Sequence, residues 1–517
     1  MIAALGQLDR LRLLITKKVW TLVLAISLCQ VPEGNAQAAE PLQLPLELGE
    51  VLASVTGKYP PYLAALIERD IANGKLRNAI GALDLQTYFR VFTQPSGFYQ
   101  ATTTELGFEQ PTTAWGATIF GGYRRTDGFL PDYYNKRRTN EDGTPILGLK
   151  VPLLRNGRID PKRAKIQKAE LDKLLADPVI QRQHLDMTLS AMKAYFGWLA
   201  AGKKLQIKRA MLEVAKQRAA AVKTQIEQGI SAPIADVENR QLIASRELDA
   251  VKARQEYEAA AIALSLFYRD ANDETIYVSP GRLPEFPQPK APGEEILSAA
   301  MQYASSTRPE VRIYELELQK LNVDTRLFRN QLQPQLDTYV SASRSLGDEL
   351  YKDKGELEVE LGVEFRVPLQ RNQAKGALEV NRGKIEKLQL SAEFAVDKIA
   401  AEVWKAYVKV QAAWEQIGLS KTNVDLARQL HQVEQDKFRL GAADFIALQI
   451  REGAAIKAQI TEIESIAKYY DALSQLLVAT ATDLREDSLR TDQHLMDLLS
   501  DTVKPPTHSA ARSQPDN

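Results

Sequence analysis

The feature that most constrains the fold of this chain is an internal repeat. The segment Val151-Pro152-Leu153-Leu154-Arg155-Asn156 recurs, at an offset of 216, as Val367-Pro368-Leu369-Gln370-Arg371-Asn372. Four further landmarks recur at an offset of 212: Lys193-Ala194-Tyr195 with Lys405-Ala406-Tyr407, Ala200-Ala201 with Ala412-Ala413, Gly229 with Gly441, and Tyr257 with Tyr469. Because five landmarks keep one order, the sequence predicts two copies of one structural unit rather than a series of unrelated domains.

The offset shortens by four residues somewhere between positions 157 and 192. Asp177-Pro178 lies in this window, and four residues make about one helical turn. Since proline removes a backbone hydrogen bond and kinks or ends a helix, we expect the first copy to absorb the extra turn at a break at Pro178.

Each copy is predicted to contain two long antiparallel helices. In the second copy residues 369–504 contain no proline, and the pattern is helical at about 374–440 and 445–483. The matching helices of the first copy are expected at about 157–228 and 234–268, with Gly229 and Gly441 as helix stops. A helix of about 67 residues spans about 100 Å. The Ala-rich stripes favour close coiled-coil packing, and the following aromatic residues are expected to serve packing rather than cofactor binding: Tyr195, Trp198, Trp404, Tyr407 and Trp414.

Ahead of the long helices the sequence alternates with period two. The clearest segment is 357–367, where the odd positions are apolar and most of the even positions are charged. Eleven residues of strict alternation are typical of a transmembrane β-strand, with apolar side chains toward lipid and polar ones toward the lumen. A half-buried sheet of a soluble domain has the same period, so the pattern alone leaves both interpretations open.

Strand hairpins are expected at about 336–367 in the second copy and, with a looser pattern, at about 114–151 in the first. Four strands would leave unpaired edges, which lipid cannot satisfy. Small barrels need about eight strands or more, so one chain cannot close a barrel, whereas two chains would supply eight strands and three would supply twelve. The transmembrane interpretation therefore requires an oligomer.

The segments outside the two copies have different compositions. Residues 1–38 read as a secretory signal, with Lys17-Lys18 before an apolar stretch and Ala36-Gln37-Ala38 as the cleavage site. Cys29 follows Leu28 rather than a small residue, so lipidation is not expected. We assign the first repeat to 39–268, a Pro-rich linker to 269–305, the second repeat to 306–484, and a polar tail that we expect to be disordered to 485–517.

Composition argues against several classes of function. The chain has 66 Lys+Arg and 66 Asp+Glu, so it lacks the basic excess expected of a nucleic-acid partner. One cysteine excludes a disulfide framework and a multi-cysteine metal site. No HExxH, phosphate-binding loop or nucleophile elbow occurs in the sequence. We therefore expect no enzyme activity, no cofactor and no metal.

Short motifs and the repeat plan together resemble the TolC family of outer-membrane efflux proteins over about residues 58–484. The motifs are Arg308-Pro309-Glu310-Val311, Leu332-Gln333-Pro334-Gln335-Leu336, the turns at Gly229 and Gly441, and Asp236-Val237-Glu238-Asn239. The resemblance implies a mainly α fold with a small β part. In such a fold the helical hairpins of a homotrimer form an α-barrel tunnel in the periplasm, and four strands per chain build a 12-stranded β-barrel in the outer membrane. The implied function is a passive exit duct for efflux or type I secretion.

The resemblance also implies partners and site residues. The helix tips would contact a periplasmic adaptor, and through it an inner-membrane pump: Gln228, Gly229, Ile230, Leu440, Gly441 and Ala442. Asp236 and Asp444 would lie near the periplasmic entrance. The barrel lumen would be lined by Glu358, Glu360, Glu364 and Arg366, and outer-membrane lipid would contact Leu357, Val359, Leu361, Val363 and Phe365.

The sequence contains one departure from the family pattern and is also compatible with an alternative function. Some family members close the tunnel with aspartates shortly after the second turn, whereas the corresponding positions here are Ala447 and Ile450. The alternative function is a soluble periplasmic coiled-coil adaptor or scaffold. That alternative accounts for the long helices but gives the alternating strands no purpose.

Overall fold

The computed structural model describes residues 44–128, 130, 137–229, 232–293, 295–348, 354–440 and 442–482. The chain divides into two units, residues 1–44 and 45–517, and every element below belongs to the second. The predicted signal (1–38) and polar tail (485–517) lie outside the described residues, as do Ile230 and Gly441.

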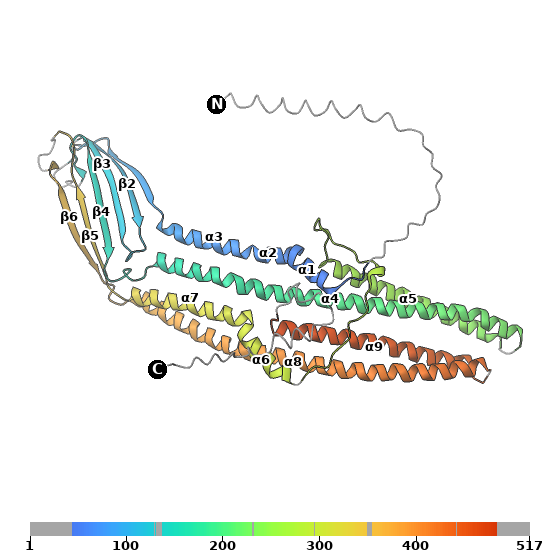
Figure 1. The fold of residues 1–517 in the computed structure, drawn as a ribbon. Coiled ribbons are helices and arrows are strands. Elements are labelled where there is room, and N and C mark those ends of the chain that lie inside the picture. Colours follow the sequence, from blue (N-terminus) through green and yellow to red (C-terminus); the bar gives the residue numbers. More distant parts are fainter. Residues whose placement is uncertain are drawn as a thin grey trace, which may run out of the picture. The chain divides into compact units, whose positions relative to one another are not determined.

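Two long helix pairs dominate the second unit (Figure 1): α4 (Pro161–Glu227) with α5 (Ile234–Ser265), and α8 (Asn372–Arg439) with α9 (Phe445–Ala479). With 67 and 68 residues, α4 and α8 are each about 100 Å long. The start of α4 is fixed by local sequence. The Asp160 carboxylate accepts the backbone N–H groups of Lys162 and Arg163 at 2.7 and 2.9 Å, and Pro161 occupies the first turn.

α4 continues through Pro178, so the predicted break at this proline is wrong. The long helices begin at 161 and 372, an offset of 211, and end at 227 and 439, an offset of 212. The offset of 216 between Asn156 and Asn372 has thus already changed before α4 begins. The extra residues of the first copy form the connection 157–160. Pro178 removes one hydrogen bond, and a helix packed along its length retains the rest.

Shorter helices lie along the part of each long helix that is nearer the sheet (Figure 1). They are α1 (Leu48–Lys58), α2 (Pro60–Leu66), α3 (Glu68–Ile80), α6 (Glu295–Thr307) and α7 (Pro309–Gln331), with single 3₁₀ turns η1 (Gly81–Leu83) and η3 (Pro280–Arg282). α3 packs on α4, and α7 contacts both α4 and α8. Within the described ranges, no helix combines the length and the apolar character needed to cross a membrane.

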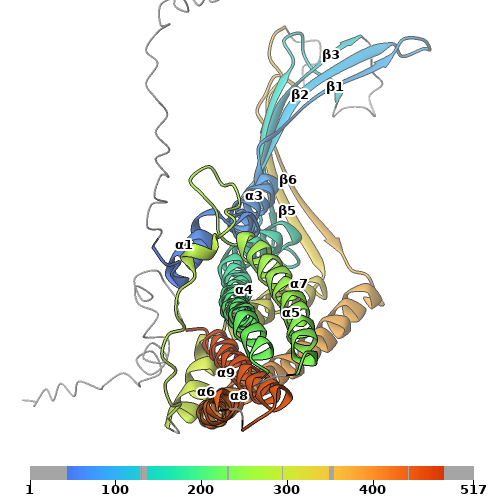
Figure 2. The same ribbon diagram turned by 90° about the vertical axis from the view of Figure 1, so that its right-hand side faces the viewer.

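One antiparallel sheet follows the order of the chain. Its strands are β1 (Gln86–Gln94), β2 (Ala101–Pro111), β3 (Thr118–Gly128), β4 (Thr144–Pro152), β5 (Gln335–Ser343) and β6 (Glu358–Arg366). Each strand pairs with the next, and β4 with β5 joins the two repeats. In Figure 1 the sheet lies at the end of the long helices that is opposite to the α4–α5 and α8–α9 turns, and Figure 2 views the helices from the end with these turns. β1 and β6 are therefore its two edges.

The mainly helical class with a small sheet is confirmed, but the predicted count of four strands is wrong, because the described sheet has six. Among the described residues, the missed hairpin, β1–β2, occurs in the first repeat alone. The helices that start at Pro60 and Pro309 correspond between the two repeats and are 249 positions apart, whereas the corresponding strands β3 and β5 start 217 positions apart. The first repeat therefore has 32 additional residues between helix and strand, which form the inserted hairpin and its connections. Its alternation is obscured because Tyr88 and Phe92 occupy the polar face of β1.

An aromatic cluster forms the centre of the core where the two long helix pairs meet. Tyr195 and Trp198 of α4 are fully buried, and the rings of Phe196 and Tyr470 stack at 4.6 Å. Trp404 does not join this cluster, contrary to the packing role predicted for it, and is 58% exposed. The buried side of α8 in this region carries Val403, Ala406 and Tyr407, and position 404 points about 100° away from its neighbour 403.

Tyrosine hydroxyls of the long helices form hydrogen bonds that hold extended segments against this core. Two repeat-related pairs of tyrosines each donate hydrogen bonds to backbone carbonyl oxygens. In the first pair, Tyr195 donates to Leu46 at 2.9 Å and Tyr407 to Gly293 at 3.2 Å. In the second pair, Tyr257 donates to Val278 at 3.4 Å and Tyr469 to Lys290 at 2.8 Å. Three of the four acceptors belong to the Pro-rich linker, which is therefore bound along the helices.

Candidate functional surfaces

The sheet presents one apolar face that crosses all six strands. Directly opposed residues share a face, and the continuous register places these side chains together: Phe89 and Val91, Leu106 and Phe108, Ile119 and Tyr123, Leu147 and Leu149, Leu336 and Val340, and Val359, Leu361, Val363 and Phe365. The four predicted β6 residues of this set are 60–77% exposed. Leu357 stands directly before β6 and is also exposed. The predicted apolar residues of β6 thus belong to a much larger surface.

The opposite face of the sheet is polar and carries paired charges. Arg124 binds Glu105 at 2.7 Å, and Lys150 lies 3.2 Å from the largely buried Asp337. The predicted Glu358, Glu360, Glu364 and Arg366 all lie on this face. Together the six strands place six acidic groups there (Glu105, Glu109, Asp337, Glu358, Glu360, Glu364) and four basic ones (Arg90, Arg124, Lys150, Arg366). The face is therefore weakly acidic.

Aromatic rings cover glycines on the polar face, a feature that the sequence analysis did not identify. Tyr88 lies over Gly107, Phe120 over Gly148 and Tyr339 over Gly362. A Cβ atom on these glycines would lie 2.4, 2.3 and 2.1 Å from the respective ring atoms, so only glycine fits. Such pairs fix strand register and protect glycine backbone. The signal in sequence would have been an aromatic residue on a polar face opposite a glycine.

The α4–α5 turn begins at Gln228 and Gly229. Gln228 caps α4, and Gly229 takes a φ of +73°, a left-handed conformation that favours glycine. The Gly229 N–H donates to the Ile226 carbonyl at 3.0 Å, and both turn residues are exposed. Ile230, predicted as a tip residue, lies outside the described residues.

The α8–α9 turn is tied by backbone hydrogen bonds. Leu440 is 83% exposed, and the Ala442 N–H donates to the Lys437 carbonyl at 2.9 Å. Hydrogen bonds from Arg439 and Gln432 lower the pKa of the exposed Asp436 carboxyl. The predicted Gly441 lies outside the described residues. The two turns come together through their flanking helices, since Ala215, Val222, Leu242 and Phe445 form one buried cluster.

The two aspartates predicted near the entrance both have local structural partners. Asp444 is the N-cap of α9, and its carboxylate accepts the Ala447 N–H at 2.7 Å. Asp236 lies in the first turn of α5 and pairs with Arg240 at 3.0 Å. Both positions are at helix N-termini, where negative charge is favoured.

A buried ion pair joins the two hairpins above the turns. Arg218 of α4 lies 2.9 Å from Glu452 of α9, and their side chains are 11% and 2% exposed. The Arg218 guanidinium also lies 5.8 Å from the centre of the Phe445 ring. Sequence reasoning missed this pair because its members are 234 positions apart and neither interrupts a helical pattern.

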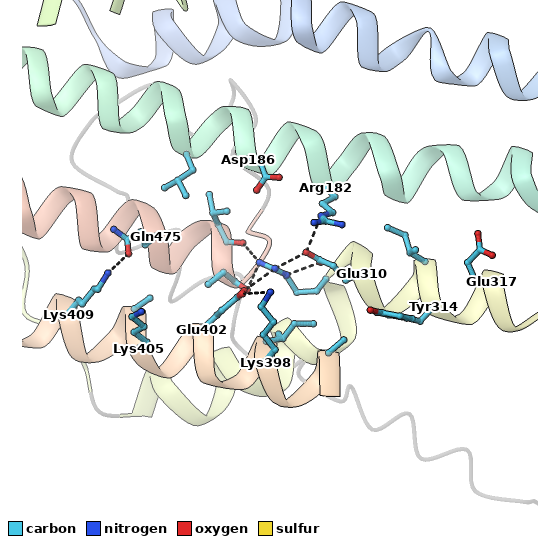
Figure 3. Close-up of a pocket in the computed structure, with 18 of the residues that line it drawn as sticks. Arg182, Asp186, Glu310, Tyr314, Glu317, Lys398, Glu402, Lys405, Lys409 and Gln475 are labelled. Atoms are coloured by element: carbon cyan, nitrogen blue, oxygen red, sulfur yellow. Dashed lines mark hydrogen bonds and ion pairs between the residues drawn. The ribbon is translucent and has the colours of Figure 1, made fainter. Parts of the chain in front are cut away.

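The Arg308-Pro309-Glu310-Val311 motif organises a junction of four helices beside a cavity of about 610 Å³ (Figure 3). Arg308 binds Glu310 at 2.8 Å and Glu402 at 3.2 Å, and donates to the Val478 carbonyl at 3.2 Å near the end of α9. Arg182 of α4 lies 3.9 Å from Glu310. These charges neutralise one another, and Arg308 also binds the buried carbonyl end of α9, so the cavity lies at a structural junction of the helices.

Solved structures of outer-membrane channels have the same fold. MtrE of Neisseria gonorrhoeae in its open state is 14% identical, with a TM-score of 0.62 over 85% of this chain and 90% of that chain. CmeC of Campylobacter jejuni is 12% identical, with a TM-score of 0.59 over 92% and 98%. VceC of Vibrio cholerae is 13% identical, with a TM-score of 0.59 over 84% and 96%.

Comparison of the amino-acid sequence with known families and curated proteins finds no match. The similarity therefore lies in the arrangement of helices and strands, which extends over nearly the whole length of the channels. The chain has the fold of the TolC-family outer-membrane channels.

Proposed function

We propose that this chain is the outer-membrane exit duct of a tripartite efflux or type I secretion system. Copies of the chain, three in our proposal, would place the sheet in the outer membrane and the long helices in the periplasm. The duct would provide a passive, water-filled path, and a pump in the inner membrane would supply the energy. The observation that carries this proposal is the exposed apolar face of the sheet.

That face is too extensive for a surface in water. Its side chains come from all six strands, and Leu361 is 77% and Phe365 65% exposed. Exposed apolar patches of this kind mark a membrane or partner surface, and the opposite face carries charges that would line the lumen. Because acidic groups outnumber basic ones there, the lumen would favour cations over anions of equal size.

Exposed apolar stripes on the helices support self-association. On α8 the following residues fall within about 40° of one line along the helix at 100° per residue: Leu390, Phe394, Trp404, Val408, Leu419, Leu426, Leu430 and Val433. A second stripe contains Val237, Leu248, Val251 and Ile262 of α5 and its C-cap residue, Leu266. Neighbouring copies that close a tunnel would bury these stripes against each other.

The helix tips are the proposed contact for a periplasmic adaptor. Gln228, Gly229 and Leu440 are exposed at the end of the long helices away from the sheet, where a partner in the periplasm would reach them. Ile230, Gly441 and Ala442 complete the proposed surface. Asp236 and Asp444 would lie beside it at the entrance.

The test places charge on the apolar face of β6. Val359→Arg and Val363→Arg should each cost about 2–4 kcal/mol if these positions are at the middle of the bilayer, so the trimer in outer-membrane fractions should be lost. Ser341→Arg on the polar face is the matched control and should leave the trimer intact. Recovery of the unaltered chain as a soluble monomer, together with indifference to all three substitutions, would favour the scaffold alternative and overturn the proposal.

A further inference from the structure

The inserted hairpin changes where copies of the chain can join. A strand in a sheet has two edges, and both edges of β3 are occupied. β2 pairs with β3 over eleven positions, from Ala101 with Gly128 to Pro111 with Thr118, and β4 pairs with its other edge. The free edges of the described sheet are those of β1 and β6. A barrel that closed between β3 and β6 would have to break the β2–β3 pairing.

The two free edges match one another. β1 and β6 each have nine residues, and in an antiparallel sheet of six strands the first and last run in opposite directions. We call the antiparallel pairing of the two nine-residue strands along their whole length, from Gln86 opposite Arg366 to Gln94 opposite Glu358, the end-to-end pairing. It sets Phe89 opposite Val363 and Val91 opposite Leu361 on the apolar face. On the polar face, Arg90 would stand diagonally between Glu360 and Glu364. Apolar residues and opposite charges are favoured as cross-strand neighbours.

We propose that β6 of one copy pairs with β1 of a second copy, so that each subunit contributes six strands and a trimer closes a barrel of eighteen. This inference rests on the proposed function, because it needs the sheet to be in a membrane. It differs from the twelve-stranded barrel implied by the sequence resemblance. The β1–β2 hairpin then forms part of the barrel wall rather than a flap on its surface.

The register of the sheet is compatible with closure. Directly opposed residues run from Tyr88 through Gly107, Gly122, Ile146 and Ser343 to Glu358. In the end-to-end pairing, Glu358 meets Gln94 of the next copy, so one subunit advances the register by the six residues between 88 and 94. Six residues of stagger for six strands give a strand tilt of about 35° from a 3.4 Å rise and a 4.8 Å spacing, at the edge of the range of closed barrels.

The extra strands widen the duct. At this tilt and spacing, eighteen strands give a backbone diameter of about 34 Å, against about 22 Å for twelve. Barrels of 16–18 strands leave an aqueous channel, whereas small barrels are filled by side chains. The proposed exit is thus wider by about half than a four-strand subunit would give.

Disulfide trapping in outer membranes tests the pairing in a chain carrying Cys29→Ser. Thr93→Cys with Val359→Cys stand opposite each other on the same face in the end-to-end register. Opposed residues have Cα atoms about 4.5–5.5 Å apart, within the reach of a disulfide, so oxidation should give covalent dimers and trimers. Thr93→Cys with Glu358→Cys point to opposite faces and form the matched control, which should remain monomeric on denaturing gels.

The outcomes separate this inference from the proposed function. A membrane trimer that lacks the Thr93–Val359 cross-link and has the narrower, twelve-strand width by electron cryo-microscopy would refute the six-strand closure while leaving the duct intact. A monomer in the soluble fraction would refute the proposed function itself. A cross-linked trimer with the wider, eighteen-strand barrel is the result expected. The width is measured on the unaltered chain, so it does not depend on the cysteine variants folding.

Discussion

At the scale of single residues, Gly362 shows what a sequence pattern leaves out. In the alternation of β6 it occupies a polar position among glutamates, and sequence reasoning assigned those positions correctly to one face of the strand. The pattern does not reveal that the Tyr339 ring lies over this glycine, because that contact depends on the register between β5 and β6. Face assignment follows from the period of a strand, whereas the choice of glycine follows from its neighbour.

We expect Gly362→Ala to weaken the sheet. A Cβ atom would lie 2.1 Å from the Tyr339 ring, and the ring displacement should cost about 1–3 kcal/mol, as overpacking typically does. The proposed oligomer should dissociate at lower temperature, measured as its loss on gels after graded heating. Gly376→Ala in α8, where nothing lies within 4 Å, is the control. The double variant Tyr339→Ala, Gly362→Ala should recover part of the loss, and a single variant as stable as the parent would contradict the overlap.

At the scale of elements, the bounds of the long helices are predicted from the sequence more accurately than the short strands. The sequence predicted helices at 157–228 and 374–440, and α4 and α8 span Pro161–Glu227 and Asn372–Arg439. Such helices repeat their pattern many times, and in the sequence a glycine follows two positions after the last residue of each. The β1–β2 hairpin has only two short strands with aromatics on its polar face, so its period was masked. Pro178 misled the sequence analysis because packing along a long helix outweighed the local cost of proline.

The contact between the two hairpins should depend on the buried Arg218–Glu452 pair. Glu452→Ala leaves the buried Arg218 charge unpaired, and breaking a buried pair costs about 3–5 kcal/mol. We expect chemical denaturation, followed by helical circular dichroism, at a clearly lower denaturant concentration. Glu227→Ala removes an exposed carboxylate at the end of α4 and should change stability little. Equal midpoints for the two variants would show that the pair carries no such role.

At the scale of the whole molecule, the sequence could indicate an oligomer but could not identify the surfaces that form it. Under the transmembrane interpretation, unpaired strand edges require more than one copy. The alternation pattern could not identify β1 as an edge strand, because the inserted hairpin was not recognised in the sequence. The helical pattern of α8 likewise could not distinguish apolar residues that are buried from those that are exposed. Trp404 illustrates the difficulty, since Val403 and Tyr407 beside it face the core while its own side chain is 58% exposed. Its position on the α8 stripe gives that exposure a reason, because the stripe is proposed to lie against a second copy.

Leu419→Asp tests that stripe without touching the core of the chain. Leu419 is 73% exposed, so the single chain should fold as before, while its neighbours Ile417 and Ser420 remain buried. In the proposed trimer the charge would replace a leucine buried between copies, whose burial is worth about 1.5–3 kcal/mol, at each of the three proposed interfaces. Light scattering on detergent-solubilised protein should then show a shift from trimer to monomer with unchanged helical content. Lys421→Asp, on another face of α8, should stay trimeric, because charge there meets water. A Leu419→Asp protein that remains trimeric at the same dilution as the parent would mean that the helical stripe is not the contact between copies, and the assembly would then have to depend on the strand edges alone.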